Sequence, residues 1–175
     1  MEITVVHTFF ANIDDDPFFA APEGVWSPAE NLLHLIQSVR PVIMALNFPK
    51  TALRLRFGKA KQASRPLAQV RDTYVNVALA SGGQARGSFL PEVQTYSPAE
   101  KVRILAKWQK KGADLQAAIG KWPEKALDSY VLPHPLLGKM TVREILFFTL
   151  YHNLHHVNDV QRLLNQAESE WFEPK

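Results

Sequence analysis

The 175-residue sequence contains no cysteine. This absence excludes disulfides, thiolate nucleophiles, zinc ribbons and cysteine-ligated iron–sulfur clusters, so histidine and carboxylate side chains remain as the chemical groups. Long apolar runs are also lacking, because stretches such as Ile145-Leu146-Phe147-Phe148 fall far short of the ~18 residues that a membrane span needs. The N-terminus lacks the basic start of a signal peptide. We therefore expect a cytoplasmic protein with no membrane partner.

Positive charge is missing from residues 1–30, which contain six acidic side chains and no Lys or Arg, whereas residues 50–71 carry seven Lys or Arg and no acid. Such asymmetry can mark a surface for nucleic acid or another anion. The basic stretch has neither regularly interleaved aromatics nor a nucleic-acid motif. We interpret it as a solvated basic loop and do not expect a nucleic-acid partner.

Three long helices are predicted from their start signals. Two of them begin with Ser-Pro-Ala-Glu, at residues 27–30 and 97–100, which combines a serine N-cap, a first-turn proline and a capping-box glutamate. The third begins at Thr141, with Glu144 at the capping-box position. Apolar periodicity extends these helices to about residues 47, 120 and 168, with a bend expected at Pro41.

Shorter helices are predicted for residues 4–14 and 67–80, whereas prolines and glycines interrupt the rest of residues 48–96. No segment alternates convincingly as a strand pair would. The fold class expected is all-α, a four-helix bundle with an irregular loop region and a short extra helix in the middle. Its length and composition favour a single domain over residues 1–175.

Three of the six histidines, His152, His155 and His156, fall within five residues on the most apolar predicted helix. Residues four apart lie about 40° from each other around a helix axis, so His152 and His156 can reach one metal ion. The pair His152 and His155 is also geometrically possible, and periodicity alone does not choose between the two pairs. A third ligand has to come from another helix, and His34 is the natural candidate because it lies within a strongly apolar stretch where a bare imidazole needs a partner. His7 and His134 are assigned no role.

Two segments resemble the DinB superfamily, in the sense of the YfiT-like four-helix metalloproteins. The first runs from Leu132 to Glu144 and is followed by Phe148, His152 and His156, and the second is Trp26-Ser27-Pro28-Ala29-Glu30-Asn31-Leu32-Leu33-His34-Leu35. The resemblance covers most of the chain and is loose over residues 48–96. It implies a helical bundle in which His34, His152 and His156 bind a divalent metal, with His155 a neighbour of the site.

The resemblance also implies an activity class. Three imidazoles leave coordination positions open, as in catalytic metal sites, and a bound metal lowers the pKa of a coordinated water or thiol. Relatives include transferases that use a low-molecular-weight thiol and metal-dependent hydrolases. We therefore expect a metal-dependent enzyme of one of these two kinds, acting on a small-molecule substrate with zinc or nickel as the metal. The alternative is a non-catalytic protein that binds a metal or a small ligand.

One departure from the family concerns the residues after the last ligand, where many relatives carry Arg-Gly-Gln and this chain has Val157-Asn158-Asp159. Any substrate contact from that stretch is therefore not carried over. Asp159 or Glu30 could orient a ligand imidazole by hydrogen bonding. The basic stretch could bind a carboxylate of a thiol or substrate. Because relatives pair through helix faces, a homodimer is expected.

Overall fold

The computed structural model describes residues 2–169. In chain order its elements are α1 (Glu2–Ala11), α2 (Asp15–Phe19), α3 (Pro28–Asn47), α4 (Lys50–Phe57), α5 (Leu67–Thr73), the π-helical turn η1 (Tyr74–Leu79), the 3-10 turn η2 (Gly87–Phe89), α6 (Pro98–Ile119), α7 (Glu124–Leu127), β1 (Val131–His134), β2 (Gly138–Thr141) and α8 (Val142–Leu163). The described chain is mostly helical, as the sequence predicted. None of its helices combines the length and apolar character that crossing a membrane requires.

The predicted helix starts are confirmed, and both hydrogen bonds of the capping box form at α3 and α8. At α6 the Glu100 N–H donates to Ser97 Oγ (3.2 Å), whereas the Glu100 carboxylate pairs with Arg103. At α3 the Ser27 N–H donates to Glu30 Oε2 (2.7 Å) and the Glu30 N–H donates to Ser27 Oγ (3.3 Å). At α8 the Thr141 N–H donates to Glu144 Oε2 (3.0 Å) and the Glu144 N–H donates to Thr141 Oγ1 (3.1 Å). These reciprocal bonds satisfy backbone donors that a helix N-terminus otherwise leaves without partners.

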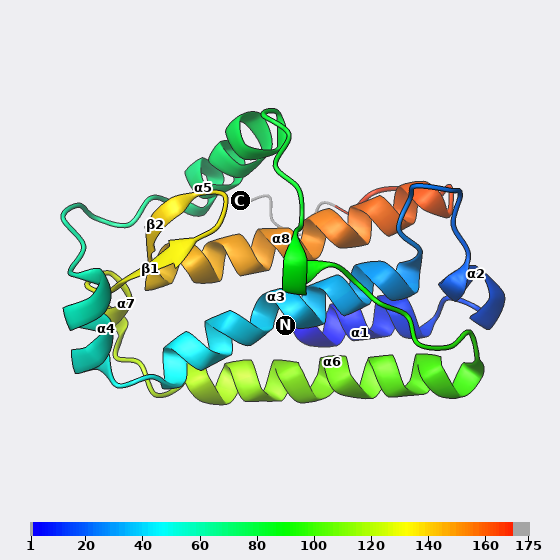
Figure 1. The fold of residues 1–175 in the computed structure, drawn as a ribbon, viewed down its shortest axis with the longest axis horizontal. Helices are drawn as coiled ribbons and strands as arrows, with labels where there is room; N and C mark the ends of the chain where they lie inside the picture. The colour runs from blue at the N-terminus through cyan, green and yellow to red at the C-terminus, as the bar shows by residue number, and fades with distance from the viewer. Residues whose placement is uncertain (1, 170–175) are drawn as a thin grey trace. The chain divides into compact units, whose positions relative to one another are not determined.

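The chain divides into two compact units, and the first takes in Met1–Val39, Gly87–Ala113 and His152–Lys175. Its apolar core joins α1, the first turns of α3 and α6, and the last turns of α8, which run beside one another in Figure 1. Phe10, Leu32, Trp108 and Val157 are among the buried members of this core. Trp108 also donates its indole N–H to the Ile3 carbonyl at 3.0 Å, which fixes α1 against α6. These four helical segments, together with Phe18 of the short helix α2, therefore form the core of this unit.

The second unit takes in Arg40–Arg86 and Asp114–Tyr151. Here Glu144 at the start of α8 accepts hydrogen bonds from the Arg65 backbone N–H (2.8 Å) and guanidinium (2.9 Å), which ties down the loop between α4 and α5. Trp122 lies in the connection that precedes α7, and its indole N–H donates to the Leu46 carbonyl at 2.8 Å. Polar contacts of Glu144 thus hold the loop between α4 and α5, and the Trp122 indole holds the short connection between α6 and α7 against the end of α3.

The structure corrects three details of the sequence prediction. A hairpin is present: β1 and β2 pair antiparallel from Val131 opposite Thr141 to His134 opposite Gly138. Gly138 adopts φ +71°, the left-handed conformation that closes a three-residue hairpin loop. The basic stretch begins as a helix, α4, and is not a loop throughout. Helix α8 ends at Leu163, before the expected residue 168. The single domain over residues 1–175 stays a prediction.

Candidate metal centre

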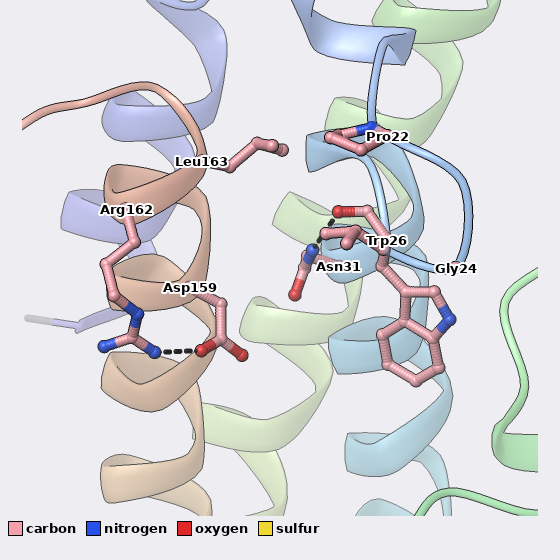
Figure 2. Close-up of a pocket in the computed structure, with 8 residues that line it drawn as sticks. Pro22, Gly24, Trp26, Asn31, Asp159, Arg162 and Leu163 are labelled. Atoms are coloured by element: carbon pink, nitrogen blue, oxygen red, sulfur yellow. Dashed lines mark hydrogen bonds and ion pairs between the residues drawn. The ribbon is translucent and has the colours of Figure 1, made fainter.

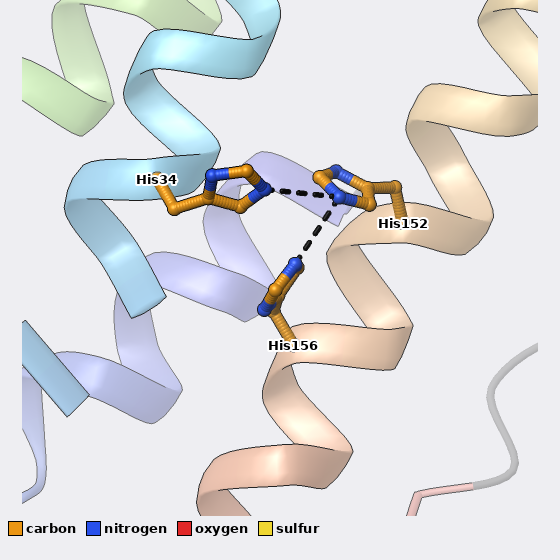
Figure 3. A group of neighbouring side chains, drawn as sticks. All are labelled: His34, His152 and His156. Carbon is orange, nitrogen blue, oxygen red and sulfur yellow. Dashed lines mark hydrogen bonds between the residues drawn. The ribbon is translucent and has the colours of Figure 1, made fainter. Parts of the chain in front are cut away.

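Three buried histidines from two helices of the first unit meet in one cluster (Figure 3). His34 comes from α3, whereas His152 and His156 lie one turn apart on α8. The Nε2 atom of His152 lies 3.2 Å from Nε2 of His34 and 3.1 Å from Nε2 of His156. The structure therefore brings together the three histidines that the family resemblance selected.

His155, the alternative partner of His152, does not belong to this cluster. Its Nε2 lies 3.5 Å from Asp159 Oδ2, and its side chain is 23% exposed. Among the described residues the remaining two histidines also lie outside the cluster. His134 sits at the end of β1, where its Nδ1 accepts the backbone N–H groups of Leu136 (3.2 Å) and Leu137 (3.1 Å). That histidine supports the hairpin loop.

The outer nitrogens of two rings are held by acceptors, and these acceptors fix the position of the protons. Nδ1 of His34 lies 2.7 Å from the Phe89 carbonyl oxygen in η2, which can only accept a hydrogen bond. Nδ1 of His156 lies 2.8 Å from Oδ1 of Asn31. The orientation of this amide is fixed because its Nδ2 donates to the carbonyls of Trp26 (3.1 Å) and Ser27 (3.0 Å). Both histidines therefore carry their proton on Nδ1 and present a lone pair on Nε2.

Two lone pairs thus point at a third imidazole nitrogen in a buried space. Without a metal, a proton on His152 Nε2 can satisfy one of them, and the Ser38 hydroxyl, 3.3 Å from His34 Nε2, can satisfy the other. A divalent cation would instead meet all three nitrogens at once. Two imidazole nitrogens that bind one ion at about 2.0–2.1 Å with a near-tetrahedral angle lie about 3.3 Å apart. The two spacings from His152 Nε2 fit this requirement, and the three ligand atoms all lie within 4.8 Å of one another.

Burial disfavours the charged form of two of these rings, those of His34 and His156. It lowers the pKa of His34 below its ordinary value, although the hydrogen bond to the Phe89 carbonyl acts in the opposite direction. The pKa of His156 is lowered further, first by burial and then by the neighbouring His152 and His34. A neutral imidazole is the form that ligates a metal, so protons compete less with a cation at this cluster than at exposed histidines.

An aromatic side chain covers one side of the cluster. The Trp26 ring is stacked on His156 with a centroid distance of 6.1 Å and lies 5.0 Å from His34. Trp26 immediately precedes the capping box of α3, so the same start signal that fixes the helix also places this ring. A partly exposed indole at this position limits the access of water to the imidazoles.

The carboxylates proposed from the sequence to orient the imidazoles are not their nearest partners. The Glu30 carboxylate accepts the Ser27 N–H in the capping box. Asp159 Oδ2 lies 3.6 Å from His156 Nδ1, beyond hydrogen-bonding distance. Asn31 and the Phe89 carbonyl take these roles instead. Asn31 could have been found as a polar residue on an apolar helix one turn before His34. The contact with Phe89 carries no sequence signal, because any residue offers a carbonyl.

Comparison with known protein families covers most of the chain. The sequence profile described as the DinB superfamily matches residues 3–160. No curated protein and no solved structure matches the chain. The matched region includes α1 to the last turns of α8, and therefore all three clustered histidines. Helical bundles are the fold of this family, as expected from the sequence. The chain belongs to the DinB superfamily.

Proposed function

We propose that His34, His152 and His156 bind one divalent metal ion, with zinc or nickel as the expected metals. The observation that carries this proposal is the convergence of three buried Nε2 atoms, two of them with lone pairs fixed by partners on Nδ1. Hydrogen bonds of this kind orient metal-ligating histidines and raise their basicity. The fit of the nitrogen spacings to one ion supports the same ligand set.

We further propose that the centre is catalytic and acts on a small-molecule substrate. A bound divalent ion would acidify a water molecule or a thiol at this site. Transfer from a low-molecular-weight thiol and hydrolysis are the two reactions consistent with that chemistry. In either reaction Asn31 and the Phe89 carbonyl would orient two imidazoles, and the Trp26 ring would shield them from water.

The second candidate is a non-catalytic protein that binds a metal or a small ligand. One observation favours it: the side chain that contacts the Nε2 side of His34 is the hydroxyl of Ser38, which is neither a strong acid nor a strong base. Catalytic metal sites commonly place a general acid or a general base beside the metal. The homodimer and the cytoplasmic location expected from the sequence stay predictions.

Titration of metal-stripped protein with Co²⁺ tests the proposal, because the visible spectrum of this ion reports its ligands. We expect one equivalent to give a spectrum that His155→Ala retains and His156→Ala loses. Addition of a small thiol should then produce a sulfur-to-metal charge-transfer band if a coordination position is open. A missing cobalt spectrum would refute the metal site. A cobalt spectrum that no thiol or anion perturbs would refute the open position and leave the non-catalytic alternative.

A further inference from the structure

A pocket of about 470 Å³ lies beside the histidine cluster within the first unit. It is formed between the segment that precedes α3 and the last turns of α8 (Figure 2). Pro22, Val25 and Leu163 supply apolar surface. Trp26, Asn31, Asp159 and Arg162 supply polar atoms. Its volume is in the range of small-molecule sites, which is about 300–1,000 Å³.

Hydrogen-bond acceptors surround this space. Figure 2 places the Asp159 carboxylate on one side and the Asn31 amide and the Trp26 carbonyl on the other. Oδ1 of Asn31 is the oxygen turned toward His156, and the Trp26 carbonyl accepts one hydrogen bond from Asn31 Nδ2. A carboxylate and a carbonyl retain further lone pairs after such contacts. The pocket is therefore equipped to receive N–H or O–H donors.

Two side chains of the lining direct donors to partners that the structure already supplies. Asn31 Nδ2 donates to two backbone carbonyls, those of Trp26 and Ser27. The Arg162 guanidinium pairs with Asp159 and also with Glu168, at 2.9 Å. In Figure 2 it extends away from the side of Asp159 that faces Asn31. One guanidinium thus serves two carboxylates, so the local charge of these three groups is negative.

We propose that this pocket binds a small organic ammonium ion with a compact apolar substituent. The ammonium group donates to Asp159 and to the acceptors opposite it, while the substituent lies against Pro22, Val25 and Leu163. Negative local charge and acceptors on both sides of the pocket favour a cationic donor, whereas Asp159 and Glu168 would repel a carboxylate.

This site is separate from the proposed metal centre. His156 directs Nε2 toward the other imidazoles and Nδ1 toward Asn31, so the ligand lies behind the ring and not on the metal. The inference therefore does not depend on metal binding and can be tested with metal-stripped protein. Because Asn31 and Asp159 both lie close to His156 Nδ1, occupancy of the pocket bears on the orientation of this imidazole.

The test is an NMR titration of the full chain with three probes of similar shape: benzylammonium, benzyl alcohol and benzoate. The signals followed are the Asn31 side-chain amide and the Gly24 backbone amide, since both residues line the pocket. We expect benzylammonium to shift these signals with an affinity at least about tenfold higher than that of either other probe, because hydrogen bonds to charged groups are the stronger ones.

Variants separate the contacts. Asp159→Asn should weaken benzylammonium binding about tenfold, whereas Asp72→Asn, which removes another arginine-paired aspartate, should leave it unchanged. Benzoate binding as tightly as benzylammonium, with loss of that binding in Arg162→Gln, would show an anion site and overturn the proposal. Absence of shifts at Asn31 and Gly24, or unchanged binding in Asp159→Asn, would overturn it as well.

Discussion

Asn31 should control the metal affinity of the histidine cluster, although it is not itself one of the proposed ligands. Its Oδ1 lies 2.8 Å from His156 Nδ1, and both side chains are buried. In Asn31→Ala the imidazole loses this acceptor. The ring can then carry its proton on Nε2 and donate to His152, which is the tautomer that cannot bind a metal through Nε2.

The magnitude follows from the buried hydrogen bond. A buried donor left without a partner costs about 1–3 kcal/mol, and loss of a partner that orients a ligand histidine costs about 10- to 100-fold in metal affinity. The two ranges agree, since about 1.4 kcal/mol corresponds to a factor of ten. We therefore expect Asn31→Ala to weaken Zn²⁺ binding by about 10- to 100-fold.

Competition between metal-stripped protein and a chelating dye measures this affinity at fixed pH. Asn47→Ala is a matched control, because Asn47 also lies on α3 and donates Nδ2 to the carbonyl four residues before it, at 3.0 Å. Asn31→Asp separates two effects: it keeps an acceptor for His156 but loses the donors to Trp26 and Ser27. It should retain metal affinity and lower the free energy of unfolding. Metal affinity within about threefold of wild type in Asn31→Ala would refute this reasoning.

Three further predictions concern stability. Burial raises the pKa of Glu144, but hydrogen bonds from Arg65 and Thr141 outweigh it and leave the pKa below its ordinary value. The carboxylate therefore stabilises the fold above the unfolded pKa and loses this effect as pH falls through the folded pKa. Glu144→Gln should cost about 2 kcal/mol at pH 7 and progressively less below pH 4.5, by urea denaturation. Burial lowers the pKa of His134 to about 4, so stability is full above pH 6.5 and declines toward pH 4. Wild type should lose free energy of unfolding between pH 6.5 and pH 5, and His134→Asn, which keeps an acceptor for the loop, should remove up to about 2 kcal/mol of this loss. The same dependence of the free energy of unfolding on pH in both proteins would contradict this prediction. A Cβ at Gly112 would lie 2.2 Å from Ile3 Cγ2, whereas one at Gly120 would lie 3.6 Å from its nearest neighbour. In thermal denaturation, Gly112→Ala should therefore lower the free energy of unfolding by about 1–2 kcal/mol, and Gly120→Ala should not.

Local signals in the sequence explain why the helix starts could be predicted. Each capping box places its two side chains within one turn, so neither needs distant contacts to form, and the structure confirms both halves at Ser27 and Thr141. The end of α8 was less predictable. Asn165 adopts φ +55°, which interrupts the helix although apolar residues continue beyond Leu163.

The features that the sequence did not reveal depend on contacts between distant segments. The four-residue strands β1 and β2 are too short for alternation to stand out, and each is defined by pairing with the other. The grouping of His34 with His152 and His156 followed from the family resemblance, because helical periodicity left His155 open. The orienting contact from Phe89 spans 55 residues and comes from a backbone carbonyl. Such a contact can be recognised only in the folded chain.

Metal binding by His34, His152 and His156 is tested by the metal content of protein purified without a histidine tag, measured by mass spectrometry. Wild type and His155→Ala should each contain close to one equivalent of a divalent metal, and His152→Ala should contain none. His155 is the matched control because it neighbours the cluster on the same helix without joining it. Wild-type protein that contains no metal and takes up none on addition would contradict a metal centre at these three histidines, as would full retention of metal in His152→Ala.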